Sequence, residues 1–584
     1  MVYVLKQKSK FLQTWLQRLF RSLYCLCVVA VISGCGDQSD GKILLASAVI
    51  TMESGDSYVN AIAIDKGKIK AVGEFESLIA RYPNYDIDRE FAERVIVPGF
   101  IDPHIHMLLG ALIYSRPFLP PWDMQTPSGL VKGLANKEEF LAALAKLEGE
   151  TEGNGPLIVY GYHNLVHGAI DRHDLDKISK DRPILVWHYS GHDFYLNSEA
   201  LDWAEVDKRL LKTYQGIELD SEGELTGRLV EDAPKHLLKK LVFELFTPAN
   251  VSKGFDGYEK LITENGVTAV AELGYGLFGK RLEDFYYWLE YKKDDPYDLY
   301  LIPEHRAFKN KYGDRSADQI LELSKVAWSR GDPRVLPRVK FFSDGAFYSQ
   351  TMKLLPPGYA CNHSHGVWAT NPDILKVEML PYWKAGLDFH IHSNGDASQS
   401  ATLEAMRFII SSGRKEGQRF IIEHGGLLSP NDLDNVASMS GGVSAASHYV
   451  HYMGKKYQQV LGDKANHITP MASALAAGIP ATLHSDAPLA PLSPLQAASV
   501  HMTRLTREGD VMLASERLTA KQGLAAITIN AAWTLGLEDE IGSIKSGKRA
   551  NLTILDRNPL ETVPEKWPQI GIWGVVIDGQ KRPL

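Results

Sequence analysis

Two histidines separated by one residue end an apolar segment, residues 95–107 (VIVPGFIDPHIHM). Side chains of a β-strand alternate between its two faces, so His104 and His106 are expected to point the same way. Two neutral imidazoles side by side at a strand end can bind a metal ion. A lone His-x-His pair is structural about as often as it binds a metal ion, so its role depends on the rest of the chain.

Four further apolar segments end in polar residues, and a turn signal follows each of them. In a parallel barrel the functional residues stand at the carboxyl ends of the strands. One histidine at a strand end is more often structural, but five strand ends of the same kind indicate a common site. The four segments are RVKFFSDG with Lys340, DFHIHSNGD with His392, FIIEHGG with His424 and ATLHSDAP with Asp486.

Four histidines and one aspartate suit a borderline cation such as Zn²⁺. They could divide between two metal ions about 3.5–4 Å apart, as in two-metal hydrolases. An unmodified Lys340 would be repelled by two dications, whereas a lysine carboxylated on its amine would supply a bridging carboxylate. The residues alone favour a simpler interpretation of Lys340, as a cation that lines a barrel or lies at the surface.

The middle of the chain, residues 98–540, alternates strand-like and helix-like segments. Helical patterns occupy residues 137–147, 317–329, 398–412 and 470–477, between apolar segments such as PLIVYGYH, PILVWHY and VTAVAEL. This alternation predicts parallel strands with crossover helices, and the number of units predicts a TIM-like (β/α)8 barrel. A doubly wound sheet is the alternative, weakened because no Gly-x-Gly-x-x-Gly follows an early strand. Residues 111–250 are richer in loops and predict an insertion near the barrel mouth.

Both ends of the mature chain are rich in short β-like segments with turns between them. Residues 42–97 contain KILLASAVITM and AIAIDKGKIKAVG, and residues 541–584 contain IGSIKSGKRANLTILD and GIWGVVIDGQ. We expect one small β-sandwich built from both ends, in an α/β protein. Two independent β-flaps are the alternative.

The N-terminus has a basic region, a short apolar run at residues 23–32 and then Ser33-Gly34-Cys35. This order of segments resembles a bacterial lipoprotein signal. The apolar run is also too short to span a bilayer comfortably. We expect a signal peptide at residues 1–34, lipidation of Cys35 and a polar tether at residues 35–41. An uncleaved membrane anchor is the alternative. Gly36 favours, by resemblance, a lipid-anchored protein of the outer membrane that faces the periplasm.

Composition excludes some functions. The chain has 584 residues and a net charge of −8, without a basic excess, so nucleic acid is not an expected partner. Cys25 and Cys27 lie in the signal and Cys35 would be lipidated, which leaves Cys361 as the one thiol of the mature chain. One thiol can form neither an internal disulfide nor a cysteine-rich zinc site.

The motifs together resemble the amidohydrolase superfamily, in the branch that contains N-substituted formamide deformylase. The similarity covers nearly all of the mature chain. VIVPGFIDPHIH resembles the first barrel strand, RVKFFSDGA the fourth, HIHSNGDAS and IEHG the fifth and sixth, and HSDAPLAPLSPLQAASVHMTR the eighth. The segments LDKISKDRPILVWHYSGHDFYLNSEAL and GELTGRLVEDA resemble the insertion of this branch, and IGSIKSGKRANLTILD its C-terminal sandwich.

The resemblance implies a role for each ligand. His104 and His106 would bind one metal ion, His392 and His424 would bind a second, and a carboxylated Lys340 would bridge the two. Asp486 would bind the first ion and face the bridging hydroxide. The chain departs from the family pattern at two places. His390 lies on the same face as His392 and is expected one layer deeper, in the core; Asn551 replaces the usual aspartate in the sandwich.

The implied function is hydrolysis of a non-peptide C–N bond in a small amide-like substrate. Two divalent ions, with zinc favoured, would generate the attacking hydroxide between them. Asp486 would take the proton from the water and deliver it to the leaving nitrogen. Two alternatives remain on the same barrel: a mononuclear deaminase, and a catalytically idle lipoprotein that only binds.

Other polar residues receive weaker assignments. His192, in SGHDFYLNS, is the candidate for a catalytic contact with the substrate. His448 and His451 are weaker candidates for the pocket wall. Asp344 is expected to orient the turn after its strand. Glu423 precedes His424, so strand alternation predicts that it faces the helices.

Overall fold

The computed structural model describes residues 41–54, 59–292, 294–360 and 363–584. The predicted signal peptide, Cys35 and nearly all of the predicted tether lie outside these residues, as does Cys361. Within the described part of the chain, no helix is both long enough and apolar enough to cross a membrane. The description that follows concerns Gly41–Leu584, which forms one unit.

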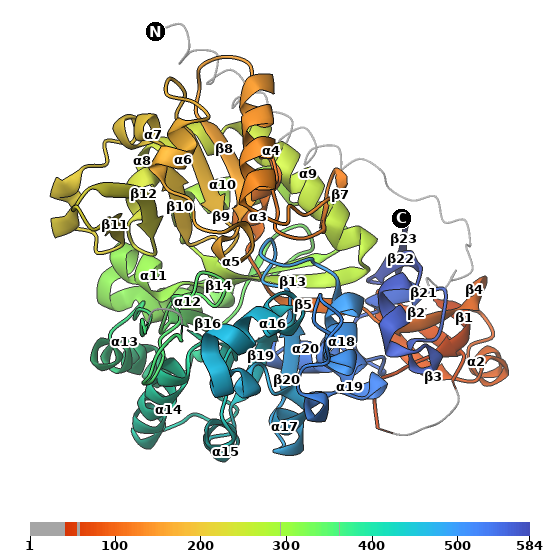
Figure 1. Ribbon diagram of the computed structural model, residues 1–584. Coiled ribbons are helices and arrows are strands. Elements are labelled where there is room, and N and C mark those ends of the chain that lie inside the picture. Colours follow the sequence, from red (N-terminus) through yellow and green to blue (C-terminus); the bar gives the residue numbers. More distant parts are fainter. Residues whose placement is uncertain (1–40, 55–58, 293, 361–362) are drawn as a thin grey trace, which may run out of the picture. The chain divides into compact units, whose positions relative to one another are not determined.

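Strands from both ends of the chain lie in one seven-stranded sheet (Figure 1). β4 and β21 join the two ends, because Leu552 pairs with Pro98 and Leu555 with Val95 in antiparallel register. The shared sheet agrees with the expectation that both ends build one β-unit, and the second layer of a sandwich stays a prediction. In spatial order the strands are β23 (Gln580–Pro583), β22 (Ile572–Ile577), β21 (Leu552–Leu555), β4 (Asp86–Pro98), β1 (Lys42–Val49), β2 (Ala61–Asp65) and β3 (Lys68–Gly73).

Two parallel sheets carry the predicted metal-binding motifs. The first contains β15 (Arg334–Val335), β14 (Asp298–Pro303), β13 (Val267–Tyr275) and β5 (Phe100–Ile105). The second contains β16 (Arg338–Phe342), β17 (Asp388–Ser393), β18 (Phe420–His424), β19 (Gly442–Ala446) and β20 (Ala481–His484). Nearly every strand residue is buried, as expected of parallel strands that helices cover on one face. The predicted α/β class is therefore confirmed.

The two parallel sheets meet at both of their edges. Glu304, just after β14, forms a parallel bridge with Lys340 of β16. At the other edge, the N–H of Asp486 donates to the carbonyl of His104, and the N–H of His106 donates to the carbonyl of Ala487. The strands are hydrogen-bonded as two sheets, so the closed eight-stranded barrel stays a prediction.

Helices follow most of the parallel strands. α14 (Asp396–Ser411) agrees with the helix predicted at residues 398–412 and buries Thr402, Leu403, Met406 and Ile409 along one stripe. The others are α3 (Met107–Tyr114), α9 (Pro248–Glu264), α10 (Lys280–Glu290), α11 (His305–Tyr312), α12 (Ser316–Ser324), α13 (Pro372–Ala385), α15 (Pro430–Ser438), α16 (Tyr449–Leu461), α17 (Met471–Ala476), α18 (Pro494–Thr503), α19 (Ala520–Ala526) and α20 (Ile529–Leu535), with α2 (Phe75–Arg81) against the seven-stranded sheet.

α12 ends five residues before the predicted boundary at residue 329. The indole of Trp328 donates to the carbonyl of Asp332 over 2.8 Å, and the hydroxyl of Ser329 donates to its carboxylate over 2.6 Å. These local bonds form a turn that competes with the helix.

Residues 111–250, which were predicted to be richer in loops and which we call the insertion, contain a sheet of their own (orange to yellow in Figure 1). PLIVYGYH and PILVWHY belong to this sheet and not to the parallel sheets that carry the metal-binding motifs. Its strands are β11 (Ile217–Leu219), β12 (Leu225–Val230), β10 (Asp193–Leu196), β9 (Ile184–His188) and β8 (Leu157–Tyr162), accompanied by the β6–β7 hairpin (Met124–Thr126 and Gly129–Val131) and by α4 (Lys137–Glu150), α5 (Asn164–His167), α6 (Arg172–Asp176), α7 (Ser198–Trp203) and α8 (Pro234–Leu245).

Asn551 lies at the junction between the seven-stranded sheet and the first parallel sheet. Its amide donates to the buried Asp298 carboxylate over 3.0 Å, and Arg549 donates to the same oxygen over 2.6 Å. The aspartate that the family resemblance leads one to expect would face Asp298 here with a second negative charge. The asparagine is therefore matched to its partner.

We expect Asn551→Asp to lower the free energy of unfolding at pH 7 by about 1–3 kcal/mol, because it replaces a donor with a carboxylate beside Asp298. The repulsion raises the pKa of the new carboxyl in the folded state. The loss should therefore be small at a pH low enough to protonate that group and should grow as the pH rises through its folded pKa. Denaturant unfolding at several pH values measures it, with Asn551→Ser as the uncharged control. Equal losses in both variants at every pH would contradict the charge argument.

Candidate metal centre

The strand ends bring the six predicted ligands into one buried cluster. Asp486 lies at its centre: its Oδ1 is 3.5 Å from His104 Nε2 and 3.3 Å from His106 Nε2. Its Oδ2 is 3.7 Å from His424 Nδ1. His424 (φ 70°) and Asp486 (φ 56°) both adopt the left-handed backbone conformation, which is unusual for residues other than glycine and common at functional sites.

Lys340 and His392 complete the cluster. Lys340 Nζ lies 3.4 Å from His104 Nε2, and its side chain is fully buried. Burial lowers the pKa of Lys340 to about 8. The ring centroids of His392 and His424 are 4.4 Å apart. All six predicted positions thus converge, although their roles stay predictions.

Three of the histidines have one ring nitrogen held by an oxygen atom. His104 Nδ1 lies 2.7 Å from Glu423 Oε2, and His106 Nδ1 lies 3.0 Å from Glu272 Oε1. His392 Nε2 lies 3.1 Å from the carbonyl oxygen of Gly345. A metal-binding histidine typically donates its other N–H in this way, which fixes its tautomer and ring orientation. The opposite nitrogens, His104 Nε2, His106 Nε2 and His392 Nδ1, are the ones left for a ligand.

The prediction that Glu423 faces the helices is wrong. Its carboxylate lies inside the cluster, between His104 and His390, and its Oε1 is 2.6 Å from His390 Nδ1. The prediction assumed that strand alternation continues through the next residue. His424 leaves the extended conformation, so two successive side chains can reach the same site. His390 is fully buried and pairs in register with Lys340, as expected of a deeper layer.

Two further residues of the cluster, Glu272 and His484, were not predicted from the sequence. Glu272 lies in β13 and also accepts the backbone N–H of Met107 over 2.7 Å. The signal was a single acidic residue within the apolar segment VTAVAELGY. His484 stacks on His104 with ring centroids 4.4 Å apart.

The residues present fit a metal ion. Two overlapping groups, His104/His424/His484 and His104/His106/Asp486, each offer ligand atoms within 4.8 Å of one another. Among the described residues, His424 Nδ1 and Asp486 Oδ1 are buried and make no hydrogen bond. Burial lowers the pKa of His104 and His424 well below the ordinary value and that of His392 to about 3, so these three imidazoles are neutral, the form that binds metals. Burial also acts to lower the pKa of His106, but the carboxylates of Asp486 and Glu272 outweigh it and raise that pKa to about 9, so His106 would release a proton on binding a metal ion.

Glu423→Gln is expected to weaken zinc binding about 10–100-fold, because glutamine keeps the shape but removes the charge that orients His104. Competition with a chromophoric chelator measures the affinity. The chain offers a matched control in Glu378→Gln, because Glu378 Oε2 pairs with His305 Nε2 over 3.0 Å in a comparable way. If both variants bind zinc as the unaltered protein does, Glu423 does not support the metal centre.

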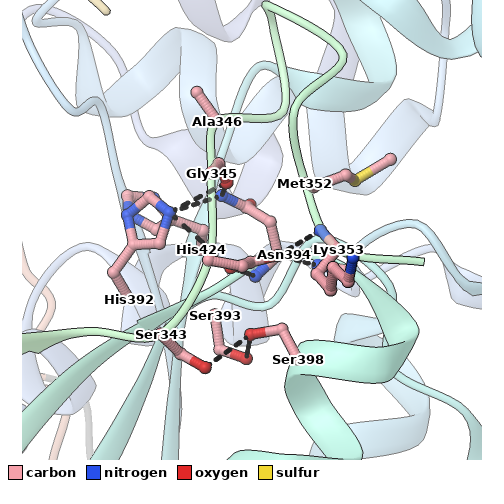
Figure 2. A network of polar contacts seen from close by, with 12 residues as sticks. Ser343, Gly345, Ala346, Met352, Lys353, His392, Ser393, Asn394, Ser398 and His424 are labelled. Atoms are coloured by element: carbon pink, nitrogen blue, oxygen red, sulfur yellow. Dashed lines mark hydrogen bonds and ion pairs between the residues drawn. The ribbon is translucent and has the colours of Figure 1, made fainter. Parts of the chain in front are cut away.

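Asp344 holds the turn after β17, whereas the prediction assigned it to the turn after its own strand, β16. Its carboxylate accepts the backbone N–H groups of Asn394 over 3.0 Å, of Gly395 over 2.9 Å and of Lys353 over 2.8 Å. Figure 2 shows the neighbouring part of this network, with His392 directed at Gly345 and Asn394. The segment after β16 therefore fixes the end of β17, which carries His392.

A cavity of about 890 Å³ opens over the cluster. Its wall includes His106, His392, Asp486 and His192, together with apolar residues of the insertion. The ring centroids of His192 and His392 are 6.4 Å apart, and His192 is 28% exposed. The apolar wall contains Trp187, Phe194, Ile217, Val230, Leu241, Leu245 and Phe246 from the insertion and Leu277 and Phe278 from the segment after β13.

His448 and His451 are not among the described residues that line this cavity. His448 is buried, with its Nδ1 2.6 Å from the hydroxyl of Ser447. His451 Nδ1 lies 3.2 Å from the carbonyl oxygen of Leu505. Both contacts are local packing contacts, so the weaker assignment of these two residues to the pocket wall is wrong.

Parallel strands whose ends gather histidines and an aspartate are typical of metal-dependent α/β hydrolases. The profile of the amidohydrolase family matches residues 92–581. The chain belongs to this family, which confirms the resemblance found in the sequence. It is an amidohydrolase-type hydrolase with a histidine-rich site for metal.

Relatives with related sequences extend over nearly the whole chain. N-substituted formamide deformylase of Arthrobacter pascens is 23% identical over 554 residues, which cover 92% of this chain and 98% of that protein. The putative amidohydrolase YtcJ of Bacillus subtilis is 24% identical over 552 residues, or 91% of this chain and 96% of that one. Protein LONG AFTER FAR-RED 3 of Arabidopsis thaliana is 24% identical over 564 residues, or 92% and 91%.

Solved structures share the fold. An uncharacterized metal-dependent hydrolase from Pyrococcus horikoshii superposes with a TM-score of 0.67 at 18% identity, over 90% of this chain and 99% of that one. An uncharacterized metal-dependent hydrolase from Pyrococcus furiosus gives 0.64 at 20% identity, over 89% and 100%. At these identities the likeness concerns the fold.

Proposed function

We propose that this protein is a binuclear metal hydrolase that cleaves a non-peptide C–N bond in a small amide-like substrate. The observation that carries the proposal is the convergence of His104, His106, Lys340, His392, His424 and Asp486 at the strand ends, below one cavity. The activity named in the A. pascens relative, removal of a formyl group from an N-substituted formamide, supports this kind of bond.

The proposed ligand sets are based on which side-chain atoms face one another in the cluster. His104, His106 and Asp486 would hold one ion, and His392 and His424 the second. Lys340, carboxylated on its amine, would bridge them, and its buried position beside His104 supports this role. Zinc is favoured because neutral imidazoles and carboxylates suit it, and the same donors accept manganese, iron or cobalt.

Metal ions held by these residues would supply two effects, a lower pKa of a bound water and polarisation of a carbonyl group. Asp486 takes the proton of the attacking water at its Oδ1, which makes no protein hydrogen bond, and returns the proton to the leaving nitrogen. His192 reaches the cavity from the insertion and donates to the substrate oxygen as negative charge develops. The apolar wall excludes water from the remaining space.

The proposal extends to the architecture. The two parallel sheets would close into one (β/α)8 barrel, and the contacts between Glu304 and Lys340 and between His104 and Asp486 support this closure. The barrel would occupy residues 98–540, and the β-unit residues 42–97 and 541–584 as a small sandwich. The lipoprotein-like N-terminus supports a lipid anchor at Cys35 and a periplasm-facing site on the outer membrane.

The metal content separates the proposal from its main alternative. Protein prepared without chelator should contain close to two equivalents of metal per chain, as measured by elemental mass spectrometry. It should also hydrolyse members of a panel of N-formyl and N-acyl amines. One equivalent, with release of ammonia from amino-substituted heterocycles, would favour a mononuclear deaminase. Two equivalents without turnover of either panel would favour a binding protein.

A further inference from the structure

The insertion places His192 and Glu231 beside each other. β10 pairs with β12 in antiparallel register, with Asp193 opposite Val230. One step beyond this pair, the N–H of Glu231 donates to the carbonyl of His192 over 3.1 Å. Their side chains meet as well, because His192 Nδ1 lies 2.9 Å from Glu231 Oε2. The sheet of the insertion therefore fixes this pair through both backbone and side chains.

The second carboxylate oxygen of Glu231 binds a different part of the chain. Thr351, in the segment after β16, donates its hydroxyl to Glu231 Oε1 over 2.6 Å. The hydroxyl of Thr351 in turn accepts the N–H of Ala346 over 2.9 Å. The adjacent carbonyl, that of Gly345, is the one 3.1 Å from His392 Nε2. A chain of polar contacts thus runs from the insertion to a predicted metal ligand.

Both members of the pair line the cavity and are partly open to it. His192 is 28% and Glu231 19% exposed. With Nδ1 directed at the carboxylate, Nε2 is the nitrogen of His192 that is free to serve the cavity. Nε2 of His192 makes no hydrogen bond to another described residue.

We propose that Glu231 is a positioning residue for the hydrolysis. Its carboxylate accepts the Nδ1–H of His192 and the hydroxyl of Thr351, and so holds the Nε2–H of His192 toward the carbonyl oxygen of a substrate above the metal centre. This inference rests on the proposed function. It makes the insertion part of the catalytic apparatus, because Glu231, just after β12, joins His192 to Thr351 in the segment after β16.

The kinetic test compares His192→Ala, Glu231→Ala and the double variant in the full-length protein. We expect His192→Ala to lower kcat about 10²–10³-fold, as does loss of one donor to a developing oxyanion. Glu231→Ala should lower kcat about 10²-fold with little change in KM and in metal content, because the imidazole is present but misplaced. The double variant should be no slower than His192→Ala. Additive losses would mean that Glu231 acts independently of His192 and would overturn the proposal.

Imidazole rescue separates positioning from a general structural role. Added imidazole should raise the activity of His192→Ala at least about tenfold, because Glu231 and Thr351 still line the place of the missing ring. It should raise the activity of His192→Ala/Glu231→Ala little or not at all. Glu231→Gln, which keeps an acceptor oxygen, should retain more activity than Glu231→Ala. Equal rescue in both His192 backgrounds would overturn the role of Glu231.

A binding measurement keeps this inference separate from the proposed function. Calorimetry should detect imidazole binding to His192→Ala at least about tenfold tighter than to the double variant, whether or not any amide is hydrolysed. An unaltered protein that is inactive on the whole amide panel would refute the proposed function. Equal imidazole binding by the two variants would refute the positioning role alone.

Discussion

Lys340→Ala is expected to abolish hydrolysis, and a short carboxylic acid is expected to restore part of it. If the lysine is carboxylated, its carboxylate would be the ligand that the two metal ions share. Without it, the stabilisation that metal ions give to transition-state charge, several kcal/mol, is lost. At about 1.4 kcal/mol per tenfold change, kcat should fall by about 10³-fold or more.

Formate, acetate and propionate should each be tested, because the space left by a fully buried lysine limits the size of the acid. Rescue should depend on acid concentration and should raise the metal content from about one equivalent toward two. Lys309→Ala, at an exposed position of α11, is the control for a lost ammonium group. Unchanged activity of Lys340→Ala without any acid would show that Lys340 is a barrel-lining cation, the interpretation that the residues alone favoured.

The positions of the candidate ligands were predictable because the signal is local. An apolar strand, a polar residue at its end and a turn occupy fewer than a dozen residues, and parallel strands align their carboxyl ends. His104, His392 and Asp486 therefore lie in one cluster as expected. Family resemblance added what spacing could not, namely the role for Lys340.

The wrong and missing predictions arise where the structure depends on residues distant in sequence or on a local change of backbone conformation. PLIVYGYH and PILVWHY have the texture of barrel strands, yet β8 and β9 belong to the insertion, because sheet membership depends on partners distant in sequence. Glu423 was assigned to the wrong face because alternation fails where His424 adopts φ 70°. Glu231 and Glu272 were missed because their histidine partners come from other strands, 39 and 166 residues away.

Asp486→Asn should reduce kcat by about 10²–10⁴-fold, the usual contribution of a positioned acid–base group. Burial opposes ionisation of Asp486, but His106, His484 and Lys340 hold its pKa at about 2, so its carboxylate is charged at neutral pH. Asparagine keeps one oxygen that can bind a metal ion but cannot carry a proton away from water. The variant thus separates the two roles that were assigned to this residue.

Saturating metal provides the decisive condition for this variant. If Asp486 were only a ligand, excess zinc or manganese should return Asp486→Asn to nearly full activity once two equivalents are bound. If it also transfers the proton, kcat should stay low at full metal occupancy while KM changes little. A substrate with a better leaving group should then recover more rate in the variant than in the unaltered protein, because it depends less on protonation of the leaving nitrogen. Equal acceleration of the two proteins by such a substrate would contradict proton delivery by Asp486.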